Sequence, residues 1–354
     1  MNGLRIDGLD VIDLSGRLSL GAVDVVFVAV RTAEGTGWYG PVTRQVGQRV
    51  RDLSGLVTTA GADPVGTLSR HLQAPPGSAL DALTSWALGV IDCALWDLRG
   101  KLAGCPVADL LSTVAAASPV RGYASHLTVE LTDLPGPEPV AAIAGAGWAF
   151  TKWGLRARAP ADADIQAARM ARSVTEAAAA AGAPVAVDAV GTWSLALAEA
   201  FARHVDRETL IWLEDPLPGR DAGYRYLASA RLPVAVGECL VLGEELAPLL
   251  TGAAPVGLCL DVVGCGGLTR AAAITRHAAR LGIPVYPHGR SLVPGTHLAA
   301  AFMQAVPAVE YRLQWEPPRQ RLLAEPLIPE NGLLKIPRAP GLGATPRSDL
   351  CPTR

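Results

Sequence analysis

The feature that most constrains the fold is an alternation, from residue 120 onward, of short apolar runs with alanine-rich helical segments. Strand-length apolar runs separated by helical stretches are typical of a parallel sheet whose connections are helices. Eight runs at a common spacing favour a closed barrel over an open sheet. They occupy residues 120–125, 150–155, 184–190, 210–216, 233–239, 257–263, 284–289 and 308–313.

The N-terminal third of the chain has a different pattern. A strand, a glycine-containing turn and a second strand are expected within residues 23–40. Residues 83–104 carry apolar side chains at three- and four-residue steps, which predicts an amphipathic helix ended by Gly104 and Pro106. We therefore predict three parts: an α+β capping domain at 1–115, a modified barrel at 116–320, and a proline- and glycine-rich segment at 321–354 that packs back on the cap.

Several of the barrel runs end in a carboxylate or a histidine. Burying a charge without a partner is costly, so these side chains belong at strand tips. In a parallel barrel these tips share the C-terminal rim, which carries the chemistry of barrel enzymes. Successive members are 26, 24, 23, 27 and 22 residues apart, about one βα repeat. They are Asp188, Glu214, Glu238, Asp261, His288 and Glu310.

Carboxylates that converge on one small volume raise each other's pKa values unless a cation lies between them. Asp188, Glu214 and Glu238 offer only hard oxygen ligands, which favours Mg²⁺ over zinc. For any single acid the alternative is a helix N-cap or a surface loop residue. The same position in successive units argues against that alternative for the whole set.

Charge and composition exclude other classes of protein. The formal net charge is −2, and no basic stripe typical of a nucleic-acid binder is present. The N-terminus lacks the pattern of a signal peptide, and no uncharged apolar run reaches the roughly 18 residues of a membrane span. Six scattered cysteines include no Cys-x-x-Cys pair. We expect a soluble, cytoplasmic protein with reduced thiols that binds neither nucleic acid nor membranes.

The chain resembles the enolase superfamily, in its mandelate racemase branch, over nearly its whole length. The matching stretches are ALWDLRGKLAGCPVADLL, VAVDAVGTWS, WLEDPL, VAVGECL, LDVVGCGGLTRA, PVYPHG and PENGLLKIPRAPGLG. Each stretch alone is a weak indication of the superfamily, but their order and spacing together are specific for it. The resemblance implies a capping domain followed by a (β/α)₇β TIM-type barrel. It also implies Asp188, Glu214 and Glu238 as ligands of one Mg²⁺ per subunit, and His288 with Asp261 as a catalytic dyad.

This set of residues suits the removal of a proton next to a carboxylate. Such a proton is weakly acidic, because its loss builds an enediolate with two negative oxygens. A divalent ion and nearby cations stabilise that charge where it develops. This superfamily is a known example of pairing a lysine or histidine base with Mg²⁺. Asp261 would fix the tautomer of the His288 base.

The second barrel strand departs from the pattern of the branch. That strand usually bears Lys-x-Lys, with the second lysine as a base, but here Lys152 is followed by Gly154. Arg156 cannot substitute, because guanidinium does not lose a proton near neutrality. With one base, a dehydration is favoured over a racemisation. Relatives that resemble rhamnonate dehydratase share this arrangement, so we predict a dehydratase of an aldonate or aldarate.

Lys152 and Glu310 are candidate catalytic residues with open roles. Only three of the 31 basic residues are lysines, so a lysine between Thr151 and Trp153 is informative. Lys152 would hold the substrate carboxylate; the alternative is a lysine that extends its stem along an edge. Glu310 would be a protonated hydrogen-bond donor to that carboxylate, or it would pair with Arg312 or another neighbour.

Several alternatives stay open. An epimerase or cycloisomerase of the superfamily places a lysine before the paired glycines of the sixth strand, and DVVGCGGL has none. A non-catalytic barrel with a vestigial site is the other alternative. Tyr123, Ser125 and His126 would contact a substrate hydroxyl or simply pack at the rim. The loop at 13–22, which covers the substrate in this family, is short, so the pocket is open or is closed by another subunit. We expect a small hydroxy-carboxylate substrate and a homo-oligomer.

Overall fold

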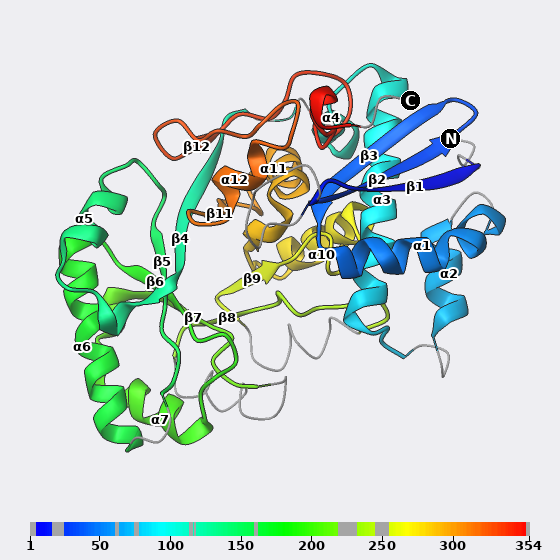
Figure 1. Ribbon diagram of the computed structural model, residues 1–354. Coiled ribbons are helices and arrows are strands. Elements are labelled where there is room, and N and C mark those ends of the chain that lie inside the picture. Colours follow the sequence, from blue (N-terminus) through cyan, green and yellow to red (C-terminus); the bar gives the residue numbers. More distant parts are fainter. Residues whose placement is uncertain are drawn as a thin grey trace.

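The computed structural model describes residues 5–15, 25–60, 64–73, 78–112, 116, 118–158, 162–218, 232–244 and 255–351. Within them, a parallel barrel lies beside a small antiparallel sheet with its own helices (Figure 1). Most of the predicted substrate-covering loop, at 13–22, lies outside the described residues, as do 219–231 and 245–254 in the connections after the fourth and fifth barrel strands.

All eight apolar runs of the second part form strands. Neighbours are parallel and pair in the order β4–β5–β6–β7–β8–β9–β10, with β11 on the other side of β4. The expected barrel is therefore confirmed. The strands are β4 (Val120–Glu130), β5 (Thr151–Gly154), β6 (Val185–Asp188), β7 (Leu210–Glu214), β8 (Val234–Val236), β9 (Gly257–Leu260), β10 (Val285–Pro287) and β11 (Val309–Arg312).

The barrel closes between β10 and β11 through contacts other than a strand ladder. The backbone N–H of Gly289, just after β10, donates a 2.6 Å hydrogen bond to Glu310 Oε2. The backbone at Gly289 lies close to β11. A Cβ on Gly289 would be 2.7 Å from Arg312 Cγ and 3.0 Å from the Glu310 carbonyl oxygen. Glycine at 289 thus lets the end of β10, with His288, lie directly against β11.

The barrel interior contains a layer of aromatic side chains. Tyr123 stacks on Phe150 with ring centroids 4.5 Å apart, and Trp212 and Tyr286 pack against this pair. Small residues on other strands leave room for these rings; they are Ala186, Ala235, Cys259 and Ala308. We call the four rings the aromatic layer. It gives the barrel a dry floor.

Helices cover the outside of the barrel. α6 begins where the Asp162 carboxylate accepts hydrogen bonds from the N–H groups of Asp164 and Ile165, and it ends at Gly182 in a left-handed conformation with φ of 66°. Its buried face packs on α7 and on the strands. The outer helices described are α5 (Glu138–Ala144), α6 (Ala163–Ala181), α7 (Leu195–His204), α10 (Leu268–Arg280) and α11 (Leu292–Ala301).

The cap combines an antiparallel sheet with three helices. Its strands pair in the order β1–β2–β3. The elements are β1 (Gly8–Asp13), β2 (Val26–Thr32), β3 (Gly35–Val42), α1 (Arg44–Thr59), α2 (Pro64–Leu72) and α3 (Ala82–Ala103). In Figure 1 the cap lies on the opposite side of the barrel from α5, α6 and α7.

Helix α3 differs from the amphipathic helix that the sequence predicts. It ends at Gly104 as expected, but it is buried on nearly every side. Glycines allow close approaches to it from both domains. A Cβ on Gly37 of β3 would lie 1.9 Å from the Ala94 carbonyl oxygen, and one on Gly89 would lie 2.0 Å from the Val263 carbonyl oxygen. The helix is thus packed between the cap sheet and the loop after β9. Its middle turns therefore have no solvent-exposed side that would carry polar residues.

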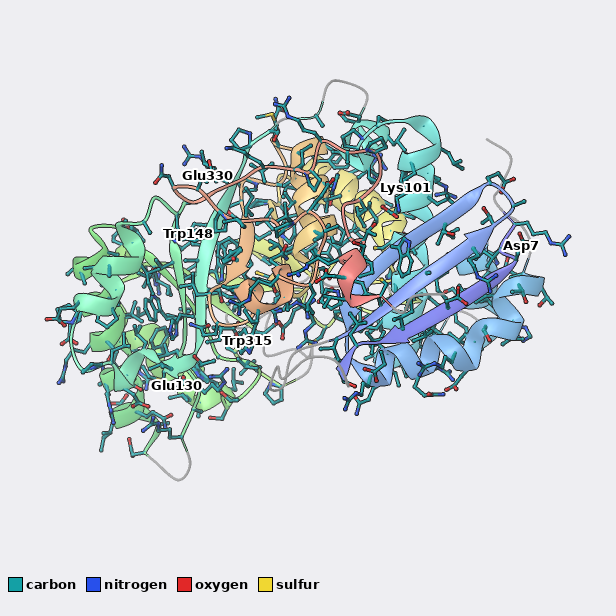
Figure 2. The ribbon with its side chains drawn as sticks, turned by 45° about the horizontal axis from the view of Figure 1, so that its top comes forward. Asp7, Lys101, Glu130, Trp148, Trp315 and Glu330 are labelled. Carbon is teal, nitrogen blue, oxygen red and sulfur yellow. The ribbon has the colours of Figure 1, made fainter. Side chains whose placement is uncertain are left out.

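The C-terminal segment returns to the cap end of the molecule. Gly341 N donates to the Cys105 carbonyl at 3.0 Å, and Leu342 N donates to Asp97 Oδ1 of α3 at 2.8 Å. The short strand β12 (Leu333–Leu334) pairs antiparallel with the start of β4. In Figure 2, Trp148 and Glu330 lie toward one end of the barrel, and Glu130 and Trp315 lie toward the other. The exact limits of the three predicted parts stay predictions.

No helix in the described part of the chain is long and apolar enough to cross a membrane.

Asp92 of α3 joins the cap to α10. Its carboxylate accepts hydrogen bonds from Thr269 N at 2.9 Å and Thr269 Oγ1 at 2.6 Å. It thereby caps a helix whose own N-cap residue, Gly267, has no side chain. Burial raises the pKa of Asp92 to about 6, even though the bonds from Thr269 oppose this shift.

We predict that Asp92→Asn removes a loss of stability that Asp92 causes in the wild type as the pH rises. Because the native pKa of Asp92 exceeds the ordinary 3.8, the native state binds the proton more tightly, and wild-type stability falls as pH rises from about 4 to about 6. The loss is at most about 3 kcal/mol. Asparagine keeps an acceptor for Thr269 but does not ionise. Thermal unfolding at pH 4.5 and 7.5 should show the difference in Tm moving in favour of the variant at pH 7.5; a constant difference would contradict the prediction.

Candidate active site

The predicted site residues form a charged layer directly on the aromatic layer. Side chains alternate along a strand, so residues two positions apart share a face. Lys152, Glu214 and His288 each lie two residues beyond a member of the aromatic layer. Asp188 ends β6 in register with Glu214 at the end of β7. The strand period thus places these charges at one level, above apolar rings.

Lys152 lies at the centre of this layer. Its ammonium is 2.8 Å from Glu310 Oε1, 3.0 Å from Glu214 Oε1 and 3.2 Å from Asp188 Oδ2. Trp212 Nε1 donates a further bond to Glu214 Oε2 at 3.1 Å. Lys152, Glu214 and Glu310 are completely buried. The alternative of a lysine extending along an edge is therefore wrong.

These buried charges shift one another's pKa values. Burial alone would lower the pKa of Lys152, but Glu214, Glu310 and Asp188 raise it well above its usual value. Burial raises the pKa of Asp188 and of Glu214, although Lys152 opposes the rise. The single positive charge of Lys152 therefore cannot neutralise the three carboxylates that it contacts.

His288 lies beside this layer, among three carboxylates. Its Nε2 is 3.1 Å from Glu238 Oε2 and 3.5 Å from Glu310 Oε2, and its Nδ1 is 3.5 Å from Asp261 Oδ2. Burial would lower the pKa of the imidazole, but Glu310 and the bonds to Asp261 and Glu238 outweigh it and raise that pKa to about 10. This direction favours the protonated form of His288.

Asp261 is fixed by hydrogen bonds to its other oxygen. Ser291 Oγ donates to Asp261 Oδ1 at 2.5 Å, and the N–H groups of Val263 and Gly264 donate at 3.1 and 2.9 Å. Oδ2 is left facing His288. Ser291 is not among the predicted site residues; its only signal in the sequence is its place three residues after His288.

The neighbours of Glu310 favour its ionised form. Burial would raise its pKa, but Lys152, His288 and the Gly289 N–H hold it well below the usual range. Glu310 forms ion pairs with Lys152 and His288, and its role toward a substrate carboxylate stays a prediction. Arg312 instead pairs with Glu316 at 2.8 Å.

The donor chemistry at the strand tips fits a hard divalent cation. Asp188 and Glu214 are adjacent, buried carboxylates whose pKa values are raised, so added positive charge would stabilise them. Glu238 follows β8 on the neighbouring strand. In the described residues, however, no three His, Cys, Asp or Glu side chains are grouped as a metal centre, because Asp188 and Glu214 bind Lys152 and Glu238 binds His288. The ligand role of the three acids stays a prediction.

A cavity of about 380 Å³ opens above the charged layer. Asp188, Glu238, Asp261 and His288 line its catalytic side. Its other lining residues were not singled out as ligand-binding by the sequence analysis. They include Trp86, Val190, Arg156, Arg290, Arg312 and Trp315. Arg312 had a usable signal, because it lies two residues after Glu310 on the same strand; Trp86 and Arg290 had none.

The three polar residues of β4 are not among the cavity-lining residues. Tyr123 belongs to the aromatic layer. His126 stacks on Trp153 with ring centroids 5.3 Å apart. Ser125 is fully buried between Arg312 and Lys152 in the sheet register. For His126 and Tyr123, packing is therefore the role found.

Comparison with known families decides the superfamily. Residues 139–350 match the enolase C-terminal domain-like family, and residues 16–112 match the mandelate racemase / muconate lactonizing enzyme N-terminal domain. The chain belongs to the mandelate racemase / muconate lactonizing enzyme family of the enolase superfamily. This confirms the resemblance noted in the sequence and the expectation of an enzyme of the lyase kind.

Curated relatives of this enolase-superfamily chain include sugar-acid enzymes. It is 27% identical to the arabinonate dehydratase of Saccharolobus solfataricus over 73% of this chain and 69% of that protein. It is 31% identical to the L-talarate/galactarate dehydratase of Salmonella typhimurium over 73% of this chain and 63% of that protein. Other relatives are named as dehydratases, a cycloisomerase and an epimerase.

A solved structure has the same fold. The mandelate racemase/muconate lactonizing enzyme-like protein of Rubrobacter xylanophilus superposes with a TM-score of 0.81, at 22% identity, over 99% of this chain and 97% of that one. At this identity the likeness establishes the fold alone.

We predict that Lys152→Met strongly destabilises the metal-free protein. Removing the ammonium leaves buried carboxylates uncompensated, which costs about 3–5 kcal/mol. Lys335→Met is the matched control: Lys335 also forms an ion pair, at 2.6 Å from Glu330, but both partners are exposed, so its loss costs less than about 1 kcal/mol. Urea unfolding in EDTA at pH 7 measures both. Equal effects of the two variants would contradict the arrangement described.

Proposed function

We propose that this chain is a Mg²⁺-dependent dehydratase of a sugar acid, an aldonate or aldarate. One observation carries the proposal: a single imidazole–carboxylate pair lies beside a buried lysine and a group of strand-tip carboxylates. That combination supplies a base and positive charge to the same small volume. Such an arrangement suits the abstraction of a proton next to a carboxylate.

Asp188, Glu214 and Glu238 would hold the metal ion. When bound, a divalent ion supplies positive charge that stabilises the developing enediolate of the substrate. Lys152 would hold the substrate carboxylate from the other side. Its ammonium is completely buried, so it acts where water does not screen it.

His288 must be neutral to act as a base. Glu238 and Glu310 help to raise its pKa to about 10. Positive charge at Glu238 opposes that rise and brings His288 closer to a base at neutral pH. Asp261, fixed by Ser291, holds Nδ1, so that Nε2 is the nitrogen available for the proton.

The proposed reaction is an elimination without net oxidation or reduction. His288 Nε2 takes the α-proton, and the electron pair of the C–H bond passes into the enediolate. That electron pair then forms the carbon–carbon double bond as the β C–O bond breaks. The departing hydroxide takes a proton from the His288 imidazolium and leaves as water. The remaining enol tautomerises to a 2-keto-3-deoxy acid.

The second strand supports elimination rather than racemisation. Gly154 is in register with Asp188, so it lies at the level where a second base would stand. A Cβ there would lie 3.3 Å from Arg156 Nη1 and from Glu130 Oε1. This place is therefore next to a guanidinium paired with a carboxylate, and guanidinium cannot act as a base.

We expect purified protein with Mg²⁺ to convert at least one member of an aldonic and aldaric acid library to a 2-keto-3-deoxy product. His288→Asn should lower kcat by at least about 100-fold, because it removes the base. His204→Asn is the control, since His204 pairs with Asp164 on the surface and should retain activity. Semicarbazide detection of the keto acid measures all three proteins.

Two outcomes would contradict this assignment. Full activity of His288→Asn would show that another group is the base. Interconversion of α-carbon stereoisomers in D₂O, without loss of water, would instead indicate an epimerase.

We predict that EDTA abolishes turnover and that Mg²⁺ restores it. Calorimetric titration of the EDTA-treated protein should give one Mg²⁺ site per subunit, because three hard oxygen ligands stand at the ends of three neighbouring strands. Asp188→Asn should weaken Mg²⁺ binding at least about tenfold. Asp164→Asn, a change at an exposed ion pair with Arg203, should leave binding unaltered. Wild-type protein that binds no Mg²⁺ would contradict the proposed metal site and favour a vestigial barrel.

A further inference from the structure

The charges that line the catalytic cavity are divided between its two sides. The carboxylates belong to β6 and to the segments that follow β8 and β9. Three arginines come from the remaining side: Arg290 follows β10, Arg312 ends β11 and Arg156 follows β5. Because β10, β11, β4 and β5 are consecutive around the barrel, the arginines form one arc opposite the acids. We call these three residues the arginine arc.

Arg312 is built into the wall of the cavity. Only 7% of its surface is exposed, and its Nη2 donates to Glu316 Oε1 at 2.8 Å. Its Nε, also buried, has no hydrogen-bond partner among the described residues. The guanidinium carbon lies 5.1 Å from the centre of the Trp315 ring, which also lines the cavity. The guanidinium is therefore held in place in the wall of the cavity.

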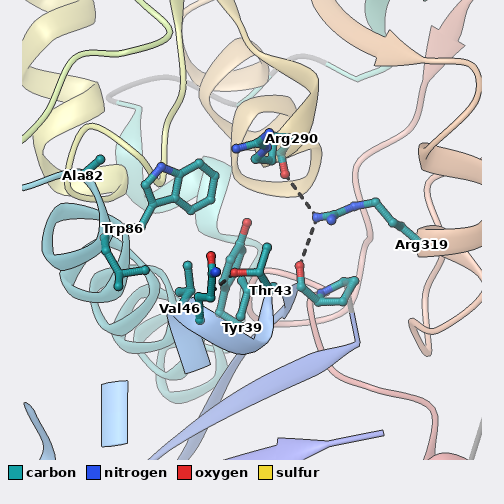
Figure 3. Close-up of a pocket in the computed structure, with 11 residues that line it drawn as sticks. Tyr39, Thr43, Val46, Ala82, Trp86, Arg290 and Arg319 are labelled. Carbon is teal, nitrogen blue, oxygen red and sulfur yellow. Dashed lines mark hydrogen bonds between the residues drawn. The ribbon is translucent and has the colours of Figure 1, made fainter. Parts of the chain in front are cut away.

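Arg290 lies at the mouth of the cavity. Its guanidinium carbon is 5.5 Å from the centre of the Trp86 ring, and its carbonyl oxygen accepts a 3.2 Å hydrogen bond from Arg319 (Figure 3). No carboxylate among the described residues forms an ion pair with Arg290. Trp86, Arg290 and Ala82 also line a second cavity of about 290 Å³ against the cap. Arg290, with an aromatic ring but no carboxylate beside it among the described residues, thus lines both cavities.

Arg156 contributes less free charge to the arc. Its guanidinium pairs with Glu130, and it donates to the Leu127 carbonyl at 3.0 Å. With Arg312 paired to Glu316, the excess positive charge of the arc is that of Arg290, while Arg312 adds a second guanidinium to the cavity lining. Arginine stacked on an aromatic ring presents its edge donors in a fixed plane, which matches a carboxylate.

We propose that the substrate carries a second anionic group, at the end remote from the reacting carboxylate, and that Arg290 and Arg312 bind it. This inference rests on the proposed sugar-acid dehydratase. One carboxylate of the substrate is used by Lys152 at the charged layer, and a neutral polyol end would leave Arg290 without a counter-charge. The substrate class is therefore an aldarate, whose two ends are both carboxylates. A phosphate ester at the far end offers the same chemistry and is the alternative source of that charge.

The test compares an aldarate, the matching aldonate and the matching 6-phosphoaldonate, in the stereochemical series with the highest turnover. For each, kcat/KM is measured with Mg²⁺ for wild type, Arg290→Gln and Arg276→Gln. Arg276 is the matched control, because its guanidinium also stacks on a ring, 5.0 Å from the centre of Phe302, but does not line the cavity. Arg290 is exposed, so its replacement leaves the fold intact.

We expect wild type to prefer the aldarate to the aldonate, and Arg290→Gln to reduce that preference about 10- to 100-fold, the effect of losing a hydrogen-bonded charge. Arg276→Gln should retain the preference. Arg312→Lys, which keeps the charge but loses the planar fork, should reduce it as well, chiefly through KM. A preference for the phosphoaldonate that depends on Arg290 would keep the anionic subsite and change its ligand to a phosphate.

Turnover of the aldonate equal to that of the aldarate, or an equal loss of both in Arg290→Gln, would overturn the inference while leaving the dehydratase in place. If none of the three compounds in any series loses water, the dehydratase itself is wrong, and the inference falls with it.

Discussion

A buried lysine among buried carboxylates is the interaction on which the rest of the site depends. Lys152 lies within 3.2 Å of Asp188, Glu214 and Glu310, above a floor of aromatic rings. Charges at such depth persist only when paired, because burial without a partner is costly. Each strand must therefore deliver its side chain at the same level. The strand register, fixed by parallel pairing, does this, and the excess of negative charge that remains makes the layer receptive to a cation.

The imidazole of His288 is affected by the same buried charges. Glu310 contacts both Lys152 and His288, so the charge on one affects the proton on the other. Asp261 is clamped through one oxygen and faces His288 with the second. His288, Asp261 and Lys152 thus form one connected set through Glu310. Its electrostatic balance, rather than any single residue, sets the protonation state of His288.

The cap is part of this arrangement. Helix α3 is packed between the cap sheet and the loop after β9, and its contacts with that loop use Gly89 and Asp92. The same helix carries Trp86, which faces the cavity beneath Arg290. The cap helix therefore contributes directly to the lining of the cavity, whereas His288, Arg290 and Arg312 all belong to the barrel.

The sequence by itself determined the eight barrel strands and the residues at their tips, because a strand buried on both faces leaves a continuous apolar run and its end leaves a charge. The alternation of side chains along a strand could also have predicted that Arg312 faces the same side of β11 as Glu310. The partners of Lys152, the clamp by Ser291 and the pairing of Arg290 with Trp86 were decided only by the tertiary structure. They join residues up to 204 positions apart, and no local period records them. Barrel closure and the docking of the cap bring those side chains within contact distance, and only the folded chain specifies both.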